Sequence, residues 1–273
     1  MTLDIDKTPI SDINTWLIGN WKMNGRLVNN EDFLENLLSK NEALIKGNAV
    51  FCGIAVPNVY LFQFSNRLID SNLFLGVQDI SSENDDGAFT GDVSAKMFKE
   101  FDCSFAIIGH SERRIKYQES DVNLVKKTKA SINNNILPII CVGETKKDRE
   151  QGNAIKIISS QVQNFTSSLT NEELCSCVFA YEPLWAIGSG KNARPSDVES
   201  MHKLIRSECV KVLGEDFVEK IKILYGGSVS ADNAEQYFLQ PGIDGALVGG
   251  ASLEASEFNK IIDKAVDTST LNT

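Results

Sequence analysis

The chain has 273 residues, of which 42% are hydrophobic and 23% charged, and it contains 19 glycines and 6 prolines. This is the composition of an ordinary globular protein and excludes collagen, coiled coil and extended disorder. Its 27 basic and 37 acidic residues leave a net charge of −10, which repels phosphate backbones at long range. Because no local basic patch offsets that charge, nucleic acid is not an expected partner.

The sequence shows no sign of export or of membrane insertion. No stretch approaches the roughly 18 apolar residues that a spanning helix needs. The first twenty residues contain Asp4, Asp6, Lys7 and Asp12, where a signal peptide has an apolar core. The six cysteines form no C-x-x-C pair and most lie in apolar runs, which is typical of buried free thiols in a reducing compartment. We therefore expect a cytoplasmic protein without a membrane partner.

Short, β-rich apolar runs alternate with stretches of helical periodicity, and no Pro/Gly/Ser-rich linker interrupts them. The predicted strands are Trp16–Gly19, Ala49–Val56, Leu73–Val77, Ser104–Ile108, Leu137–Val142, Cys177–Tyr181, Ile221–Tyr225 and Asp244–Val248. The predicted helices are Glu31–Leu44, Val59–Ile69, Ser94–Phe101, Asp121–Asn134, Ala154–Leu169, Ser196–Leu213, Ala231–Leu239 and Ser256–Ala265.

The order of these elements predicts the fold class. Strands that are apolar on both faces and are each followed by a helix belong to a parallel sheet. Eight such repeats without a domain break favour a closed (β/α)₈ barrel over an open doubly wound sheet, so we predict a single α/β domain. We assign residues 16–267 to the barrel, residues 1–15 to a polar N-terminal extension and residues 268–273 to a C-terminal tail.

Active sites of such barrels lie at the C-terminal ends of the strands, so residues that directly follow the apolar runs are the candidates. His110 follows the fourth run and is either a satisfied structural residue or a catalyst. Residues 111–114 indicate a helix start, whose dipole is expected to lower the pKa of the imidazole. A neutral imidazole can donate a hydrogen bond to a substrate oxygen. His202 lies within a predicted helix and is expected at the surface.

Glu182 follows the sixth run and is either half of a structural ion pair or a general base at the rim of a partly dry cavity. The stiff segment 183–185 and the small, Gly-containing segment 186–190 follow it, as expected of a lid that moves as a unit. The string 188–191 is similar to part of a P-loop. The full pattern G-x-x-x-x-G-K-[ST] fails at Trp185 and Asn192, which excludes that nucleotide-binding motif.

Small residues follow the last two predicted strands, namely Gly226, Gly227, Ser228, Gly249 and Gly250. One glycine pair alone is compatible with a simple turn. Barrels of this kind often bind phosphate at that place through backbone N–H groups, so two pairs together with Gly188 favour a phosphate site. Lys22, after the first strand, supplies positive charge nearby.

Five segments, in chain order, resemble motifs of the triosephosphate isomerase family. They are 19–25 (GNWKMNG), 108–114 (IGHSERR), 180–191 (AYEPLWAIGSGK), 225–229 (YGGSV) and 247–253 (LVGGASL). The resemblance implies the TIM barrel fold. It also implies interconversion of dihydroxyacetone phosphate and D-glyceraldehyde 3-phosphate, in glycolysis and gluconeogenesis, with no metal and no organic cofactor.

The resemblance further implies a role for each matching residue. Glu182 is expected to move a proton between C1 and C2 through an enediolate, and His110 to polarise the carbonyl. Lys22 is expected to offset negative charge with the support of Glu112, and Asn20 to donate a hydrogen bond to the substrate. The backbone N–H groups expected to bind the phosphate are those of Gly188, Ser228, Gly249 and Gly250.

The connection 79–91 is similar to the interdigitating loop of the family, whose tip, including Thr90, inserts beside the active site of a partner subunit. The resemblance therefore implies a homodimer. Three positions depart from the family pattern: Asp79 stands where Asn is common, Leu184 where Val is usual and Ser189 where Thr is common. We expect these departures to affect dimer strength and lid opening rather than the type of reaction.

Two other functions are open on the sequence alone. A different phosphate-binding barrel enzyme would share the glycines after the last two strands, but it does not explain why His110, Glu182 and Lys22 all match. A catalytically silent relative that serves as a binding or adhesion protein would be expected to carry a lesion in the site. The sequence has none, so we expect the isomerase.

Overall fold

The structure is a computed structural model that describes residues 15–41, 50–187 and 192–271. Eight parallel strands close into a barrel in chain order, with β8 hydrogen-bonded to β1. The strands are β1 (Thr15–Asn20), β2 (Val50–Val56), β3 (Phe74–Val77), β4 (Phe105–Ile108), β5 (Leu137–Val142), β6 (Val178–Tyr181), β7 (Lys222–Tyr225) and β8 (Gly245–Val248). The predicted barrel is confirmed, and each strand ends within one residue of its predicted run.

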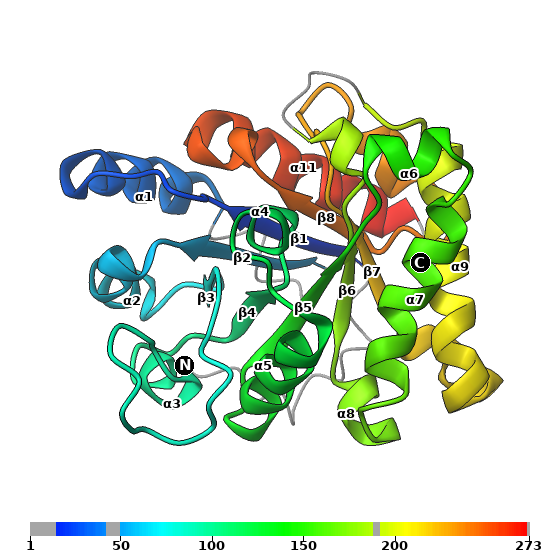
Figure 1. Cartoon of the computed structure of the whole chain (residues 1–273). Helices are drawn as coiled ribbons and strands as arrows, with labels where there is room; N and C mark the ends of the chain where they lie inside the picture. Colours follow the sequence, from blue (N-terminus) through cyan, green and yellow to red (C-terminus); the bar gives the residue numbers. More distant parts are fainter. Residues whose placement is uncertain (1–14, 42–49, 188–191, 272–273) are drawn as a thin grey trace.

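Helices surround the barrel on its outside (Figure 1). They are α1 (Leu27–Asn41), α2 (Leu61–Leu68), α3 (Ala95–Lys99), α4 (Ser111–Lys116), α5 (Asp121–Asn133), α6 (Lys146–Glu150), α7 (Ala154–Thr166), α8 (Asn171–Cys175), α9 (Pro195–Leu213), α10 (Ala234–Phe238) and α11 (Ala255–Leu271). Short 3-10 turns are η3 (Asn58–Tyr60), η4 (Leu184–Ala186), η5 (Glu215–Lys220) and η6 (Gly250–Leu253). None of the helices in the described ranges is long and apolar enough to cross a membrane.

Helix α11 continues past the predicted end at Ala265 and reaches Leu271. Thr268 and Ser269 are buried, and each hydroxyl donates a hydrogen bond to a carbonyl of the preceding turn. This local bonding satisfies the two hydroxyl groups inside the packed face of the helix. Residues 268–271 therefore belong to the last helix rather than to a tail, and residues 1–14 lie outside the described ranges.

Aromatic rings close the N-terminal end of the barrel interior. Trp16 stacks on Phe51 with ring centroids 4.2 Å apart, and Phe51 stacks on Phe74 at 4.4 Å. Phe105 lies edge-on to Phe51 at 6.2 Å. Because all four rings come from the first or second residue of their strands, the barrel is a packed core there and its C-terminal end is the place for a site.

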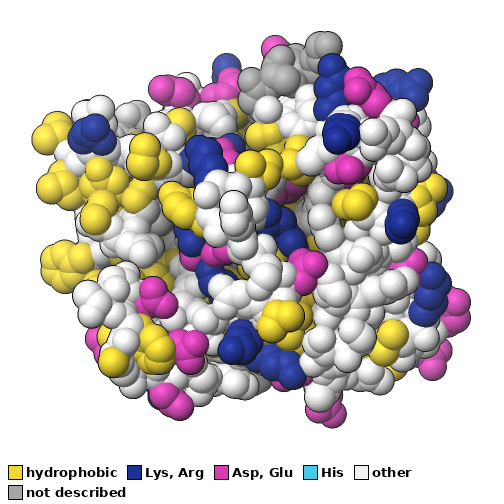
Figure 2. Space-filling model, viewed as in Figure 1, with side chains coloured by type: hydrophobic (Ala, Val, Ile, Leu, Met, Phe, Trp, Pro, Cys, Tyr) yellow, Lys and Arg dark blue, Asp and Glu magenta, His cyan; other side chains and the backbone are white. Residues whose placement is uncertain are grey.

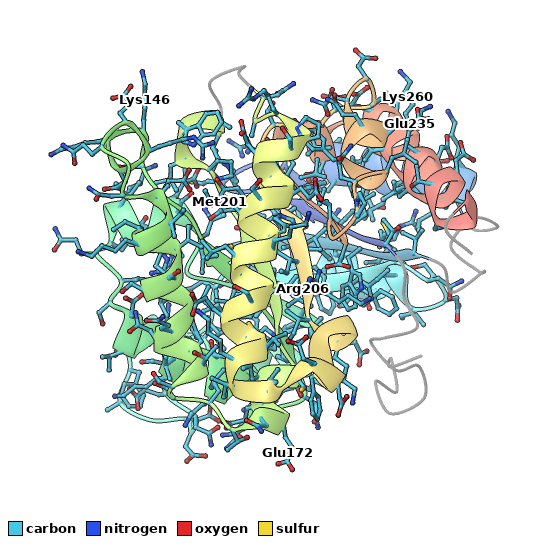
Figure 3. The ribbon with its side chains drawn as sticks, turned by 90° about the vertical axis from the view of Figure 1, so that its right-hand side faces the viewer. Lys146, Glu172, Met201, Arg206, Glu235 and Lys260 are labelled. Carbon is cyan, nitrogen blue, oxygen red and sulfur yellow. The ribbon has the colours of Figure 1, made fainter. Side chains whose placement is uncertain are left out.

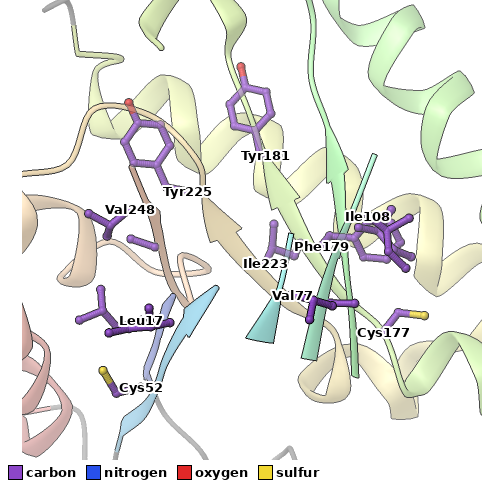
Figure 4. Packing of buried hydrophobic residues seen from close by; sticks show 14 of the residues in the cluster. Leu17, Cys52, Val77, Ile108, Cys177, Phe179, Tyr181, Ile223, Tyr225 and Val248 are labelled. Carbon is purple, nitrogen blue, oxygen red and sulfur yellow. The ribbon is translucent and has the colours of Figure 1, made fainter. Parts of the chain in front are cut away.

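Strand side chains that point outward pack against the helices. Figure 4 shows part of this layer, with Leu17, Phe179, Ile223 and Val248 among its fully buried members. On one side of the barrel, α9 packs beside α7 (Figure 3). Strands covered on both faces explain why the predicted runs were continuously apolar rather than alternating.

Two glycines make room for Phe105. A Cβ on Gly53 would lie 2.5 Å from Phe105 Cε1, and one on Gly76 would lie 2.2 Å from Cε2 and Cζ. We expect Gly76→Ala to lower the free energy of unfolding by about 1–3 kcal/mol, because the ring or β3 must shift. Adding Phe105→Leu should restore part of that loss. Urea unfolding of the single and double variants measures both effects, and an unchanged midpoint for Gly76→Ala would contradict this packing.

Candidate active site

The C-terminal end of the barrel brings together the residues predicted from separate motifs. Glu182 and His110 follow β6 and β4, and both are buried, with 2% and 6% of their surfaces exposed. Glu182 Oε1 lies 3.0 Å from His110 Nε2. Glu182 Oε2 accepts a hydrogen bond of 2.8 Å from the backbone N–H of Ser111. The two predicted catalytic side chains are therefore in direct contact.

Gly226, directly after β7, gives the Glu182 side chain its space. A Cβ at this position would lie 2.8 Å from Glu182 Cγ. Gly226 is one of the glycines predicted for a phosphate site, whereas in the structure its missing side chain leaves room for Cγ of Glu182. A larger residue here would force either the Glu182 side chain or the backbone after β7 to shift.

The environment of Glu182 keeps its carboxyl group ionised. Burial raises the pKa of Glu182, but the neighbouring His110, the Ser111 N–H and the charge of Lys22 outweigh burial and hold this pKa below its usual value. The buried thiol of Cys141 lies close by. Burial and the Glu182 carboxylate raise its pKa well above the usual value, so the thiol stays neutral.

His110 is the N-cap of α4, as the predicted helix start implied. Its Nδ1 accepts a hydrogen bond of 3.2 Å from the Glu112 N–H, so Nδ1 carries no proton. Burial lowers the pKa of His110, but the adjacent Glu182 carboxylate outweighs burial and raises this pKa above its usual value. The expected lowering of the pKa is therefore wrong for this arrangement. A ring with one proton, on Nε2, satisfies both contacts.

Lys22 lies in the loop that follows β1, and its side chain reaches α4. Its Nζ is 2.9 Å from Glu112 Oε1, and its backbone N–H donates to Asn20 Oδ1 at 3.0 Å. A Cβ on Gly249 would lie 3.6 Å from Lys22 Cε, which shows that the lysine side chain passes the glycine pair after β8. The Lys22 side chain and this glycine pair are thus neighbours, as expected from the sequence.

Three of the four predicted phosphate ligands, Ser228, Gly249 and Gly250, lie among the described residues. Gly249 caps η6, and a Cβ added to Gly250 meets nothing within 4 Å, so the backbone there faces open space. Ser228 follows β7, and its carbonyl accepts a hydrogen bond of 3.1 Å from Asn233. Gly188, like the departing position Ser189, lies outside the described residues.

Glu144, which was not among the predicted site residues, anchors the segment that follows Glu182. It is fully buried, and its Oε1 accepts hydrogen bonds from Tyr181 Oη at 3.1 Å, Trp185 Nε1 at 2.9 Å and Arg149 at 3.1 Å. The sequence did contain a signal that could have identified Glu144 as a site residue, because this glutamate closely follows the fifth predicted strand. This carboxylate holds the first turn of the predicted lid segment against the barrel.

The charge of Asp79 is balanced by two cations within the protein. Both of its oxygens lie within 2.8 Å of Lys127 Nζ, and Arg113 is 2.8 Å from Asp79 Oδ2. Glu119 bonds the same two cations. Four alternating charges therefore tie the end of β3 to α4 and α5, and Asp79 brings no unbalanced charge to the connection 79–91.

His202 lies in α9, as predicted, but it is fully buried, so the expected surface position is wrong. Its Nδ1 is 3.1 Å from the carbonyl oxygen of Gly242, and its Nε2 has no hydrogen-bond partner among the described residues. Burial lowers the pKa of His202 to about 4. The spacing of Val198, His202, Ile205 and Cys209 shows that the histidine belongs to the apolar face of the helix.

We expect His202 to make the protein acid-sensitive. In the unfolded chain the pKa of His202 is near 6.5, whereas in the folded protein it is about 4. Between these pH values the unfolded state therefore binds a proton that the folded state does not bind. The contribution of His202 to stability is complete above pH 6.5 and falls by about 2 kcal/mol between pH 7 and pH 5. Urea unfolding of the wild type and of His202→Gln over that range tests this. Equal losses in the two proteins would contradict it.

Comparison with known proteins agrees with the motifs. The sequence matches the family model described as triosephosphate isomerase over residues 15–265. The triosephosphate isomerase of Hahella chejuensis is 44% identical over 251 residues, which cover 92% of this chain and 98% of the relative. Those of Streptococcus thermophilus and Nitrosomonas europaea are 41% identical over 248 residues (91% and 97%) and 42% over 246 residues (90% and 96%). The chain therefore belongs to the triosephosphate isomerase family.

Proposed function

We propose that this protein interconverts dihydroxyacetone phosphate and D-glyceraldehyde 3-phosphate by proton transfer through an enediolate, as a step of glycolysis and gluconeogenesis. The observation that carries the proposal is the contact between the buried carboxylate of Glu182 and Nε2 of His110. An ionised base and a hydrogen-bond donor at one point are what the removal of a proton next to a carbonyl requires.

Glu182 acts as the base in this proposal. Its carboxylate leaves His110 and Ser111, removes a proton from one carbon of the triose and returns it to the neighbouring carbon. His110 then donates from Nε2 to the substrate oxygen on which negative charge develops. Once the carboxylate has moved away, burial and Lys22, which both lower the pKa of His110, are opposed only by the weaker effect of Glu112. The imidazole is then a neutral donor.

Binding of the substrate falls to residues around this pair. The ammonium of Lys22, held by Glu112, offsets the charge of the phosphate and of the enediolate. Asn20 uses its Oδ1 for the Lys22 backbone, which leaves its amide nitrogen to donate to the substrate. The backbone N–H groups proposed to bind the phosphate are those of Gly188, Ser228, Gly249 and Gly250.

The proposed reaction needs no metal and no organic cofactor. One carbon is oxidised while its neighbour is reduced within the same molecule, and the atoms that travel are protons. The six free cysteines of the structure support a reducing compartment, and we place the reaction in the cytoplasm.

A coupled assay that starts from D-glyceraldehyde 3-phosphate tests the proposed function. We expect rapid formation of dihydroxyacetone phosphate, unchanged by a metal chelator. No turnover by correctly folded protein would overturn the proposal and favour a silent binding protein. Turnover of another phosphorylated metabolite in place of the triose would favour a different barrel enzyme.

We also propose that the protein is a homodimer. Met23, Val59 and Phe62 are 94%, 77% and 70% exposed, and Phe89 is exposed beside Thr90 in the connection 79–91. Figure 2 shows hydrophobic side chains gathered on the side that carries α1 and α2. An apolar surface of this kind is typical of a protein contact. In the proposed dimer the connection 79–91, with Thr90, inserts beside the partner's active site.

Sedimentation at micromolar concentration tests the dimer. We expect a dimer for the wild type and a monomer of low activity for Phe62→Glu, because the new charge would be buried in the contact. Ile155→Glu, at an exposed apolar position on α7, is the matched control and should remain dimeric. A stable, fully active monomer of the wild type would refute this arrangement.

A further inference from the structure

Gln78 directly follows β3 and has no role in the chemistry proposed above. Gly76, two residues earlier, faces Phe105 inside the barrel, so the strand alternation points Gln78 into the barrel mouth. We propose that Gln78 is a positioning residue that holds the backbone of Lys22 and thereby places the Lys22 ammonium at the substrate. This inference rests on the proposed function, because it assigns the support of one of its binding groups.

Lys22 needs such support because its backbone is in an unusual conformation. Its φ is 52°, in the left-handed region that residues with a Cβ rarely adopt. Such a conformation persists when the surroundings fix it, and it is common at functional sites. The Asn20 side chain holds the Lys22 N–H from one side, at 3.0 Å. A second group is needed to hold the carbonyl.

Gln78 supplies that second group. Its Nε2 donates a hydrogen bond of 2.9 Å to the Lys22 carbonyl and one of 3.0 Å to the carbonyl of Ala55 in β2. Both hydrogens of the amide are therefore used, and the Lys22 peptide is tied to the barrel wall. A carboxylate in this place has no hydrogen to donate, and a hydrocarbon chain has neither the donor nor the acceptor.

The position of the Gln78 backbone is fixed in turn by its neighbour. Asp79 is bonded to Lys127 of α5 and to Arg113 of α4. The end of β3 thus connects the backbone of Lys22 with α4, the helix that carries Glu112, the ionic partner of Lys22 Nζ. The Lys22 carbonyl is held by Gln78 and the Lys22 ammonium by Glu112. The elements that carry these two residues, the end of β3 and α4, are joined by the ion pair between Asp79 and Arg113.

Without Gln78, the Lys22 peptide is free to rotate toward an ordinary conformation. That rotation changes the direction of the Cα–Cβ bond and carries the ammonium away from Glu112 and from Gly249, beside which the Lys22 side chain now lies. A displacement of about 1 Å at a reacting group costs on the order of 100-fold in rate. The loss would affect substrate binding and turnover together, as a loss of Lys22 itself would.

A double-mutant cycle tests this inference. We expect Gln78→Met to lower kcat/KM by about 10-fold to 100-fold, with an increase in KM and a decrease in kcat. In protein that already carries Lys22→Met, the same change should lower kcat/KM by less than about 2-fold, because the lysine that it positions is gone. Gln163→Met, which removes a hydrogen bond to Glu208 away from the site, is the control and should be silent in both backgrounds.

The outcomes separate this inference from the proposed function. A wild-type protein that does not isomerise the triose refutes the function itself. An active wild type in which the losses from Gln78→Met and Lys22→Met multiply refutes the positioning role alone and leaves a general structural one. If Gln78→Met does not fold, Gln78→Leu removes both donors without adding a charge and should give the same pattern in the cycle. Thermal unfolding of every variant checks that the barrel is intact.

Discussion

Replacing Glu182 by aspartate is expected to lower kcat by about 100-fold or more, with KM changed by no more than a few-fold. The shorter side chain withdraws the carboxylate by about 1 Å from the carbon whose proton it removes. No substrate-binding contact is assigned to Glu182, whose oxygens meet His110 and Ser111 in the free protein. The effect therefore belongs to the chemical step, and steady-state kinetics in both directions measures it.

The same substitution at another buried glutamate separates this effect from a general loss of structure. Glu208 lies on α9 and bonds Lys211 and Gln163 away from the barrel mouth. Glu208→Asp should keep kcat close to the wild-type value while it lowers stability slightly. If Glu182→Asp were silent, Glu182 would not be the base.

Replacing Lys22 by methionine is expected to raise KM and lower kcat, each by more than about 10-fold. Methionine retains much of the length of the side chain but removes the charge that offsets the phosphate and the enediolate. It also leaves Glu112 without its cation and adds an unbalanced negative charge beside an anionic substrate. Binding of inorganic phosphate, followed by calorimetry, should weaken in parallel with the rise in KM.

Lys264→Met is the matched control for this variant. Lys264 makes a similar ion pair of 2.8 Å with Glu235, between α11 and α10. Its loss should leave both kinetic constants unchanged. A Lys22→Met protein with normal KM and a reduced kcat would show that the lysine acts on the transition state and contributes nothing to substrate binding.

The barrel was predictable from the sequence because its strands are covered on both faces. Every residue of β5 and β6 is buried, and runs such as 137–142 therefore stand out from the polar connections. Helices α6 and α8 were not predicted. They have five residues each and begin with capping boxes at Thr145 and Thr170, so local hydrogen bonds rather than an apolar period define them.

The candidate site was predictable as a set of positions but not as a set of contacts. Glu182 and Ser111 are 71 residues apart, and no local pattern reveals that they share a hydrogen bond. The contact between Glu182 and His110, which are also far apart in the sequence, reverses the expected direction of the pKa shift at His110. Gln78 and Glu144 were overlooked because each is a common polar residue after a strand, and their roles depend on partners that only the closed barrel brings near.

The aromatic stack of Trp16, Phe51 and Phe74 leaves substrate and product no path through the N-terminal end of the barrel. Because this end is closed, a molecule that binds at the C-terminal end of the barrel must enter and leave from that same end. The aldose and the ketose therefore share one entrance and one binding site, and one must dissociate before the other can bind. For the proposed isomerisation, this geometry makes inhibition by either triose phosphate strictly competitive with the other.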